Sequence, residues 1–195
     1  MPYSDVDDLL AVLNCLDIER AHLVGLSMGG IVSVHFALGH SGRVRGLVAA
    51  DCGPGGITGP SDLLSDAEEL AAAGRTTEAQ EKWLASSVFA PARERPQVAA
   101  RLQEMVSEYT WWRAQHPGLR RALHPPAAEH LDEISAPTLV IVGERDVPNV
   151  HAASNTLASG IRGARLSVLP GIGHMSNMED PEAFNSAVLS FVGGL

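Results

Sequence analysis

Apolar residues along this chain follow two patterns, short continuous runs and helical spacing. Four short and mainly apolar runs end in turn residues, as buried strands of a parallel sheet do: Ala21–Leu26, Val44–Ala50, Pro137–Gly143 and Arg165–Leu169. Helical spacing predicts helices over residues 4–17 and 28–38, and a last helix after Asp180. Strands that alternate with helices indicate an α/β fold with a mostly parallel sheet and flanking helices.

Capping signals support two of these helices. Ser4 is followed three residues later by Asp7, which resembles a capping box at the start of the first helix. Asp180 precedes Pro181, so an N-cap residue is followed by proline at the first helical position. These signals predict that the first helix begins near Ser4 and that the last helix begins at Pro181.

The segment between the second and third strands has a different composition. Residues 58–130 contain no convincing strand, and their apolar residues form three amphipathic stripes. The first stripe, which stops at Gly74, is Leu63, Leu64, Ala67, Leu70 and Ala71; the second is Trp83, Leu84 and Val88; the third is Val98, Leu102, Met105, Tyr109 and Trp112. We predict that residues 58–130 form a helical cap inserted at a strand end, and that residues 1–57 and 131–195 form the core. Ligands of α/β sheets bind at the carboxyl ends of the strands.

Composition narrows the class of protein. The chain has 195 residues, 45% of them hydrophobic, which is enough for one domain with its own core. Its net charge of −9 argues against a nucleic-acid partner and against binding to a membrane surface, since both favour basic proteins. No apolar run approaches the roughly 18 residues of a spanning helix, and the acidic start is not a secretory signal. Cys15 and Cys52 do not make a disulfide framework, so we expect a cytoplasmic protein.

The strongest chemical signal is GLSMGG, Gly25–Gly30, which lies where the first strand meets the second helix. The pattern G-x-S-x-G in that setting predicts a nucleophile elbow, a tight turn that lifts the Ser27 hydroxyl above the sheet edge. Glycine on either side, at Gly25 and Gly29, lets neighbouring backbone approach without a Cβ. The alternative is an ordinary tight turn with no catalytic role.

A serine hydroxyl needs a general base, and one of the eight histidines is well placed to be it. His174 lies in a glycine-flanked loop after the fourth strand and before the last helix, from which it can reach across the top of the sheet. We predict surface or packing positions for the others: His22, His35, His40, His116, His124, His130 and His151.

An acid that orients the imidazole is expected after another strand. Asp146 follows the third strand and is the preferred candidate, because Glu144 lies nearer the strand. Asp51, which closes the second strand, is the competing candidate, and its alternative role is to form a turn. The order Ser27, Asp146, His174 is the serine–acid–histidine order that accompanies the elbow. It predicts a hydrolase-type triad.

Other motifs add little. Trp111 and Trp112 could line a substrate pocket under the cap, or they could pack between helices. The sequence has no phosphate-cradling P-loop, no H-E-x-x-H helix and no paired-cysteine spacing. Gly171-x-Gly173 is too short for a dinucleotide fingerprint. We therefore expect neither a metal nor another cofactor.

Three blocks of sequence together resemble the α/β-hydrolase fold superfamily, in its cap-bearing serine esterase and lactonase-like branch. They are GLSMGG at Gly25–Gly30, APTLVIVGERDVP at Ala136–Pro148 and LPGIGHMSNMEDPEAF at Leu169–Phe184. The resemblance covers nearly the whole chain. It implies acyl transfer without a cofactor on a small-molecule substrate, namely a carboxylic ester, a lactone or a related acyl compound.

The resemblance also implies a role for each residue of the triad. Ser27 would attack a carbonyl, and His174 would take and return the proton. Asp146 would hold the imidazole in its useful tautomer, and the main-chain N–H of Met28 would be one oxyanion donor. Serine at the elbow argues against a haloalkane dehalogenase, which resembles this family but uses a carboxylate nucleophile.

The chain departs from the family pattern at its N-terminal end. It begins at the helix that leads into the elbow strand, whereas the family pattern has earlier strands and a His-Gly segment that supplies a second oxyanion N–H. Cys52–Gly56 is the one other glycine-rich candidate for that role, and an ordinary turn is the preferred interpretation of it. The elbow strand is then expected at an open, apolar sheet edge, which invites association.

Two functions remain open. The first is a serine hydrolase. The alternative is an N-terminally truncated, catalytically impaired fragment or binding module that associates, for example as a homo-oligomer, through its exposed edge. The missing N-terminal strands have three candidate explanations. They are a misplaced start, a deliberate fragment, or a short protein that a partner completes.

Overall fold

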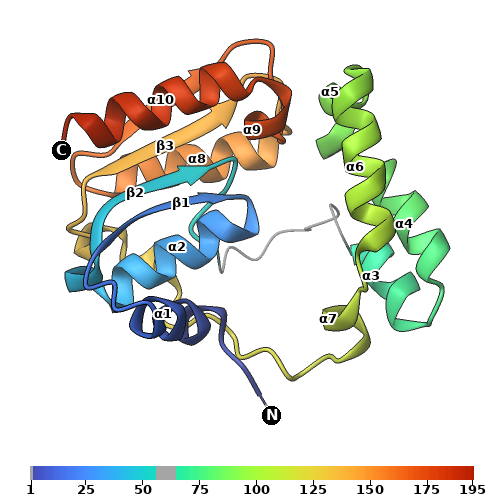
Figure 1. The fold of residues 1–195 in the computed structure, drawn as a ribbon, viewed down its shortest axis with the longest axis horizontal. Coiled ribbons are helices and arrows are strands. Elements are labelled where there is room, and N and C mark those ends of the chain that lie inside the picture. Colours follow the sequence, from blue (N-terminus) through green and yellow to red (C-terminus); the bar gives the residue numbers. More distant parts are fainter. Residues whose placement is uncertain (1, 56–64) are drawn as a thin grey trace.

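The computed structural model describes residues 2–55 and 65–195. Within them, four parallel strands form one sheet in the order β1-β2-β3-β4 (Figure 1). The strands are β1 (Ala21–Leu26), β2 (Val44–Ala50), β3 (Thr138–Gly143) and β4 (Arg165–Leu169). The predicted α/β class with a parallel sheet is confirmed, and the strands begin and end within one residue of their predicted limits.

The central and outer strands differ in burial. β2 and β3 lie at the centre and are buried along almost their whole length, as their continuous apolar runs predict. β1 and β4 are the outer strands, and Val24 on β1 and Val168 on β4 are each about half exposed. In the described part of the chain β1 pairs with β2 alone, so the elbow strand lies at an edge of the described sheet.

Helices cover both faces of the sheet (Figure 1). On one side lie α1 (Asp5–Cys15), α2 (Met28–Gly39) and α8 (Pro148–Gly160), and on the other lies α10 (Pro181–Gly193). Successive side chains of a strand point to opposite faces. Leu47 of β2 therefore belongs to the core that contains Phe36 and Leu157, whereas the next residue, Val48, belongs to the core that contains Phe191.

Both predicted helix caps are present. Ser4 Oγ accepts a hydrogen bond from the N–H of Asp7 at 3.3 Å, and Asp180 accepts one from the N–H of Ala183 at 2.9 Å. Each cap satisfies one of the first-turn N–H groups that have no acceptor within the helix. The last helix begins at Pro181, as predicted.

Helices occupy most of residues 65–115, between β2 and β3, and Figure 1 shows them beyond the carboxyl ends of the strands. They are α3 (Ser65–Ala72), α4 (Thr76–Leu84), α5 (Ala90–Arg93), α6 (Pro96–Glu108) and α7 (Trp112–Gln115); α9 (Ser176–Glu179) follows β4. Leu63 and Leu64 of the first stripe lie outside the described residues. The division into a core and a cap stays a prediction. None of the described helices is long and apolar enough to cross a membrane.

The predicted helix that reaches Trp112 is wrong. α6 ends at Glu108, because Tyr109 is extended and Trp111 takes a left-handed conformation with a φ of 56°. The rings of Tyr109 and Trp111 both pack on Trp83, at centroid distances of 5.5 and 5.2 Å. Side chains two residues apart do not face the same side of a helix. Because both rings pack on Trp83, α6 has to end before Tyr109.

The second stripe breaks as well. α4 ends at Leu84, and Val88 lies in a separate 3-10 turn at Ser87–Phe89. On α6 the buried residues are Leu102 and Val106, while Met105 of the predicted stripe is 43% exposed. The stripe therefore identified the helix and the buried position of Leu102, but the next buried residue is Val106 and not Met105.

Candidate active site

Each strand brings one polar residue to the same edge of the sheet. In chain order these are Ser27 after β1, Asp51 after β2, Asp146 beyond β3 and His174 in the loop after β4. The strands are parallel and their carboxyl ends are in register. Side chains that are far apart in the sequence therefore converge at this edge, where α/β sheets place their ligand sites.

Ser27 occupies a strained turn between β1 and α2. Its φ of 51° and ψ of −116° are rarely adopted by residues with a side chain. A Cβ at Gly25 would lie 2.3 Å from the carbonyl oxygen of Gly29, and one at Gly30 would lie 2.4 Å from the sulfur of Cys52. A Cβ at Gly29 would meet no heavy atom of the surroundings within 4 Å, so the predicted need for glycine at that position is wrong. The turn requires glycine at position 25, where a Cβ would collide with Gly29.

The structure brings the three predicted triad residues together. His174 Nε2 lies 3.0 Å from Ser27 Oγ, and His174 Nδ1 lies 2.8 Å from Asp146 Oδ2. The Asp146 side chain is fully buried, and its other oxygen accepts the main-chain N–H of Val147 at 2.7 Å. Because the carboxylate accepts from Nδ1–H, Nε2 is left as the acceptor for the serine hydroxyl.

The surroundings of His174 favour its protonated form. Burial by itself lowers the pKa of His174, but the hydrogen bond and charge of Asp146, together with the charges of Asp51 and Glu179, outweigh it. The pKa of His174 therefore lies above its usual value. An imidazole in this setting can accept a proton, because the imidazolium that forms is stabilised by nearby carboxylates.

Asp51 and Glu144, the other candidate acids, bond to different partners. One Asp51 oxygen accepts the N–H of Gly143 at 2.8 Å, and the other accepts the hydroxyl of Ser176. Burial raises the pKa of Asp51 to about 7, although both hydrogen bonds act in the opposite direction. Glu144 accepts the N–H of Gly171 at 2.8 Å. The two hydrogen bonds of Asp51 therefore connect the ends of β2 and β3 with α9.

The N–H of Met28 lies at the start of α2, directly after Ser27. First-turn N–H groups have no acceptor within the helix and carry partial positive charge. The Met28 N–H is thus suited to an oxyanion, and its role as a donor stays a prediction. The Met28 side chain is 47% exposed and contacts the guanidinium of Arg113, which belongs to α7.

The segment Cys52–Gly56, the candidate for a second oxyanion donor, has the features of a turn where it is described. Gly55 has a φ of 72°, and a Cβ at Gly53 would lie 2.5 Å from the Cβ of Ala153 on α8. Gly56 lies outside the described residues.

The two predicted pocket residues have different surroundings. Trp111 is 1% exposed and packs with Ala71, Ala79 and Trp83, so helix packing, the alternative to a pocket role, describes it. Trp112 is 44% exposed and stacks on His116 with a centroid distance of 4.6 Å. A pocket role for Trp112 stays a prediction.

Glu179 and Ser176 were not predicted from the sequence as functional residues. Both are buried polar residues of α9, just after the histidine loop. The sequence signal for them was weak. Polar residues in a helix do not indicate burial, because exposed helices carry polar residues too. Their partners lie on other elements, which local patterns do not reveal.

The α/β-hydrolase fold has parallel strands with a serine elbow, an acid and a histidine at their carboxyl ends, in that chain order. Comparison with known proteins agrees. The model of the alpha/beta hydrolase family matches residues 1–187, and the chain belongs to this family.

Curated relatives of known activity are longer than this chain. The 2-hydroxy-6-oxononadienedioate/2-hydroxy-6-oxononatrienedioate hydrolase of Paraburkholderia phymatum is 34% identical over 95% of this chain and 66% of its own length. The hydrolase of the same name from Klebsiella pneumoniae subsp. pneumoniae is 31% identical over 94% of this chain and 66% of its own length. The chain therefore spans a little under two thirds of these relatives.

Solved structures show the same fold. A hydrolase from Pseudomonas aeruginosa PA01 has a TM-score of 0.81 and 32% identity, covering 99% of this chain and 73% of that one. The enol-lactonase from Burkholderia xenovorans LB400 also has a TM-score of 0.81, with 25% identity, covering 98% of this chain and 74% of that one.

Proposed function

We propose that this chain is a serine hydrolase that acts on a small carboxylic ester, lactone or related acyl compound through Ser27, His174 and Asp146. The observation that carries the proposal is the position of His174, whose ring nitrogens lie 3.0 Å from Ser27 Oγ and 2.8 Å from Asp146 Oδ2. A serine hydroxyl is a weak nucleophile until a base takes its proton. The hydrolases and the enol-lactonase among the similar proteins support the same class of activity.

In the proposed mechanism, Ser27 Oγ attacks the carbonyl carbon while His174 Nε2 takes the hydroxyl proton. The Met28 N–H stabilises the negative charge that develops on the carbonyl oxygen. His174 then gives the proton to the leaving oxygen, and the acyl group remains on Ser27. Water, deprotonated by the same imidazole, releases the acyl group and restores the serine. These steps need no metal or organic cofactor.

The substrate is expected to bind between the start of α2 and the helices that follow β2. The contact between Met28 and Arg113 brings α7 beside the elbow. A site bounded by these elements places the substrate carbonyl near Ser27 Oγ and near the first N–H groups of α2. The helices between β2 and β3 would then select the acyl group.

Hydrolysis of activated aryl esters tests this proposal. Ser27→Ala should lower kcat/KM by at least about 10³-fold, because no other group can form the acyl intermediate. Ser159→Ala is the matched control, since Ser159 is an exposed serine of α8 that bonds to its own helix. An unchanged rate in Ser27→Ala would contradict the proposal.

A second candidate function, a binding module that associates through β1, is favoured by one observation. β1 pairs with β2 alone among the described residues, and Val24 on it is 47% exposed. An unpaired strand edge is a template for another chain. This candidate predicts self-association without reaction at Ser27.

A further inference from the structure

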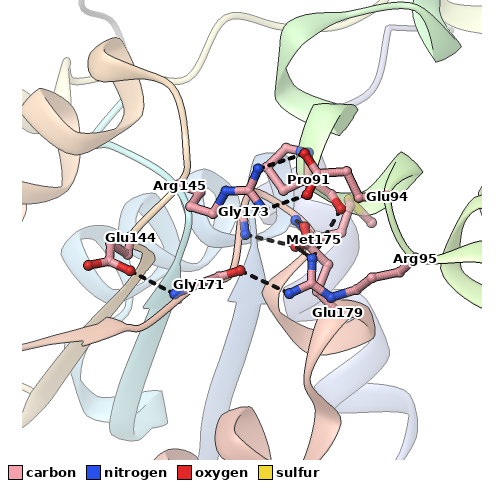
Figure 2. Close-up of polar contacts among 9 residues, drawn as sticks. All are labelled: Pro91, Glu94, Arg95, Glu144, Arg145, Gly171, Gly173, Met175 and Glu179. Carbon is pink, nitrogen blue, oxygen red and sulfur yellow. Dashed lines mark hydrogen bonds and ion pairs between the residues drawn. The ribbon is translucent and has the colours of Figure 1, made fainter.

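Two main-chain N–H groups that flank His174 donate to the same carboxylate. The N–H of Gly173 lies 2.8 Å from Glu179 Oε2, and the N–H of Met175 lies 3.2 Å from Glu179 Oε1 (Figure 2). Glu179 is the last residue of α9, and its side chain reaches back to the loop. The backbone that carries the imidazole is therefore held on both sides by one side chain.

Burial makes this carboxylate dependent on a positive partner. The Glu179 side chain has no exposed surface, and a buried carboxylate is costly unless it is paired and hydrogen-bonded. Arg95, the residue before α6, lies 3.1 Å from Glu179 Oε2 through Nη1. Its Nη2 donates to the carbonyl of Gly171 at 2.9 Å, and its Nη1 also donates to the carbonyl of Pro91 at 3.0 Å. One arginine of the helical segment thus holds both Glu179 and the histidine loop.

Packing and a second ion pair join the same two parts of the molecule. A Cβ at Gly173 would lie 2.6 Å from Pro91 Cγ, so α5 lies directly against the residue before His174. Arg145, which follows β3, pairs with Glu94 at 2.6 and 2.7 Å (Figure 2). Both side chains of this second pair are about half exposed, in contrast to Glu179.

We propose that Glu179 is a positioning residue for His174, and that Arg95 links it to the helical segment, so that the docking of α5 and α6 sets the place of the imidazole. The inference rests on the proposed function of Ser27 and His174. Glu179 acts through His174 and has no contact with substrate. Without its carboxylate, the N–H groups of Gly173 and Met175 lose their acceptor, and a displacement of about 1 Å in a catalytic group can cost about 10²-fold in rate.

The charge of Glu179 provides a readout that packing alone does not. The charged groups that face His174 are Asp146, Asp51 and Glu179, and Glu179 in turn faces Arg95 and Arg145. Burial lowers the pKa of His174, and the three carboxylates raise it. Removal of the negative charge at Glu179 is therefore expected to lower the pKa of His174.

The experiment compares two test variants with two matched controls. Glu179→Gln removes the charge with little change in shape, and Arg95→Met removes its counter-charge. Glu144→Gln alters a carboxylate that accepts the N–H of Gly171 farther along the same loop, and Glu104→Gln breaks an exposed ion pair with Arg101 within α6. Each variant is measured for aryl ester kinetics, for thermal unfolding, and for titration of the His174 imidazole by NMR, with His174→Gln to assign the resonance.

Glu179→Gln should lower kcat by about 10- to 100-fold with little change in KM, and it should move the His174 titration to lower pH. Glu144→Gln and Glu104→Gln should each change kcat by less than about twofold, since exposed carboxylate contacts contribute little. A folded Glu179→Gln variant with the parent kcat and the parent His174 titration would overturn the proposal.

If Glu179→Gln does not fold, Arg95→Met decides the question. We expect a several-fold lower kcat, partly restored in Arg95→Lys, whereas the parent kcat would overturn the proposal. The NMR titration separates this inference from the proposed function. A folded parent chain without reactivity at Ser27 contradicts the proposed function, while the shift of the His174 titration in Glu179→Gln, or its absence, still decides the role of Glu179.

Discussion

Ser27 holds a backbone conformation that residues with a side chain rarely adopt, and the neighbouring glycine makes it attainable. The carbonyl oxygen of Gly29 lies where a Cβ at Gly25 would collide with it. Backbone strain of this kind persists only where the surrounding structure holds it in place. Here β1 and α2 hold the turn from both sides, so the position of Ser27 depends on the absence of one methyl group.

Replacement of Gly25 by alanine is expected to distort the elbow. The new methyl group would lie 2.3 Å from the Gly29 carbonyl oxygen, and overpacking of this kind costs about 1–3 kcal/mol. Gly29→Ala is the matched control, because its Cβ would meet no neighbouring atom within 4 Å and alanine is the better helix former. Urea unfolding should show a lower free energy of unfolding for Gly25→Ala alone. Equal losses in the two variants would contradict this interpretation of the turn.

The convergence of Ser27, Asp146 and His174 could be predicted from the sequence because each residue carries a local signal. Ser27 lies in a strand–turn–helix motif, and Asp146 and His174 follow recognisable strands, whose carboxyl ends must meet at one edge. Glu179 and Ser176 could not be predicted in the same way. Their hydrogen bonds reach the histidine loop and the end of β2, and no spacing along the chain encodes those contacts.

At the scale of elements, continuous apolar runs set the strand limits closely, because β2 and β3 are buried on both faces. Helix limits between β2 and β3 followed the pattern less well. There the rings of Tyr109 and Trp111 pack on Trp83, and this contact ends α6 at Glu108 although the apolar spacing continues. Tertiary packing of large aromatic rings outweighed the local periodicity.

Asp51 links three elements, and its titration should appear in the stability of the whole fold. Burial raises the pKa of Asp51 from 3.8 to about 7, so between these pH values the folded chain keeps a proton that the unfolded chain releases. Stability contributed by Asp51 is therefore fully present below pH 3.8 and declines as the pH rises through about 7, by at most about 1.4 kcal/mol per pH unit.

Asp51→Asn removes this titration while its amide oxygen can still accept the N–H of Gly143. The free energy of unfolding of the parent chain, measured by urea at a series of pH values, should fall relative to that of Asp51→Asn as the pH rises from 3.8 to about 7. Parallel curves for the two proteins across this range would show that Asp51 does not titrate in this way.

At the scale of the whole molecule, helices cover both faces of the described sheet, and β1 and β4 are its outer strands. The helices between β2 and β3 lie beyond the carboxyl ends of the strands, and among the described residues no strand pairs with the outer side of β1. Exposed apolar strands at a sheet edge favour association with another chain. Val24, on this strand, is nearly half exposed.

We therefore expect the purified chain to self-associate through β1. Light scattering after gel filtration should give a mass above 20.6 kDa that increases with concentration. Val24→Lys should reduce the association, because lysine on an edge strand opposes pairing, whereas Val168→Lys on the other outer strand, where Val168 is 48% exposed, should not. A monomer at all concentrations, or equal effects of the two variants, would contradict association through β1.

The most direct test of the proposed chemistry is covalent labelling of the folded chain with a fluorophosphonate, read by intact mass beside Ser27→Ala. His174 lies within hydrogen-bond distance of both Ser27 and Asp146, so we predict one adduct on the parent chain and none on Ser27→Ala. Circular dichroism of both proteins confirms that they are folded. A folded parent chain that forms no adduct would contradict the assignment of Ser27 as an activated nucleophile.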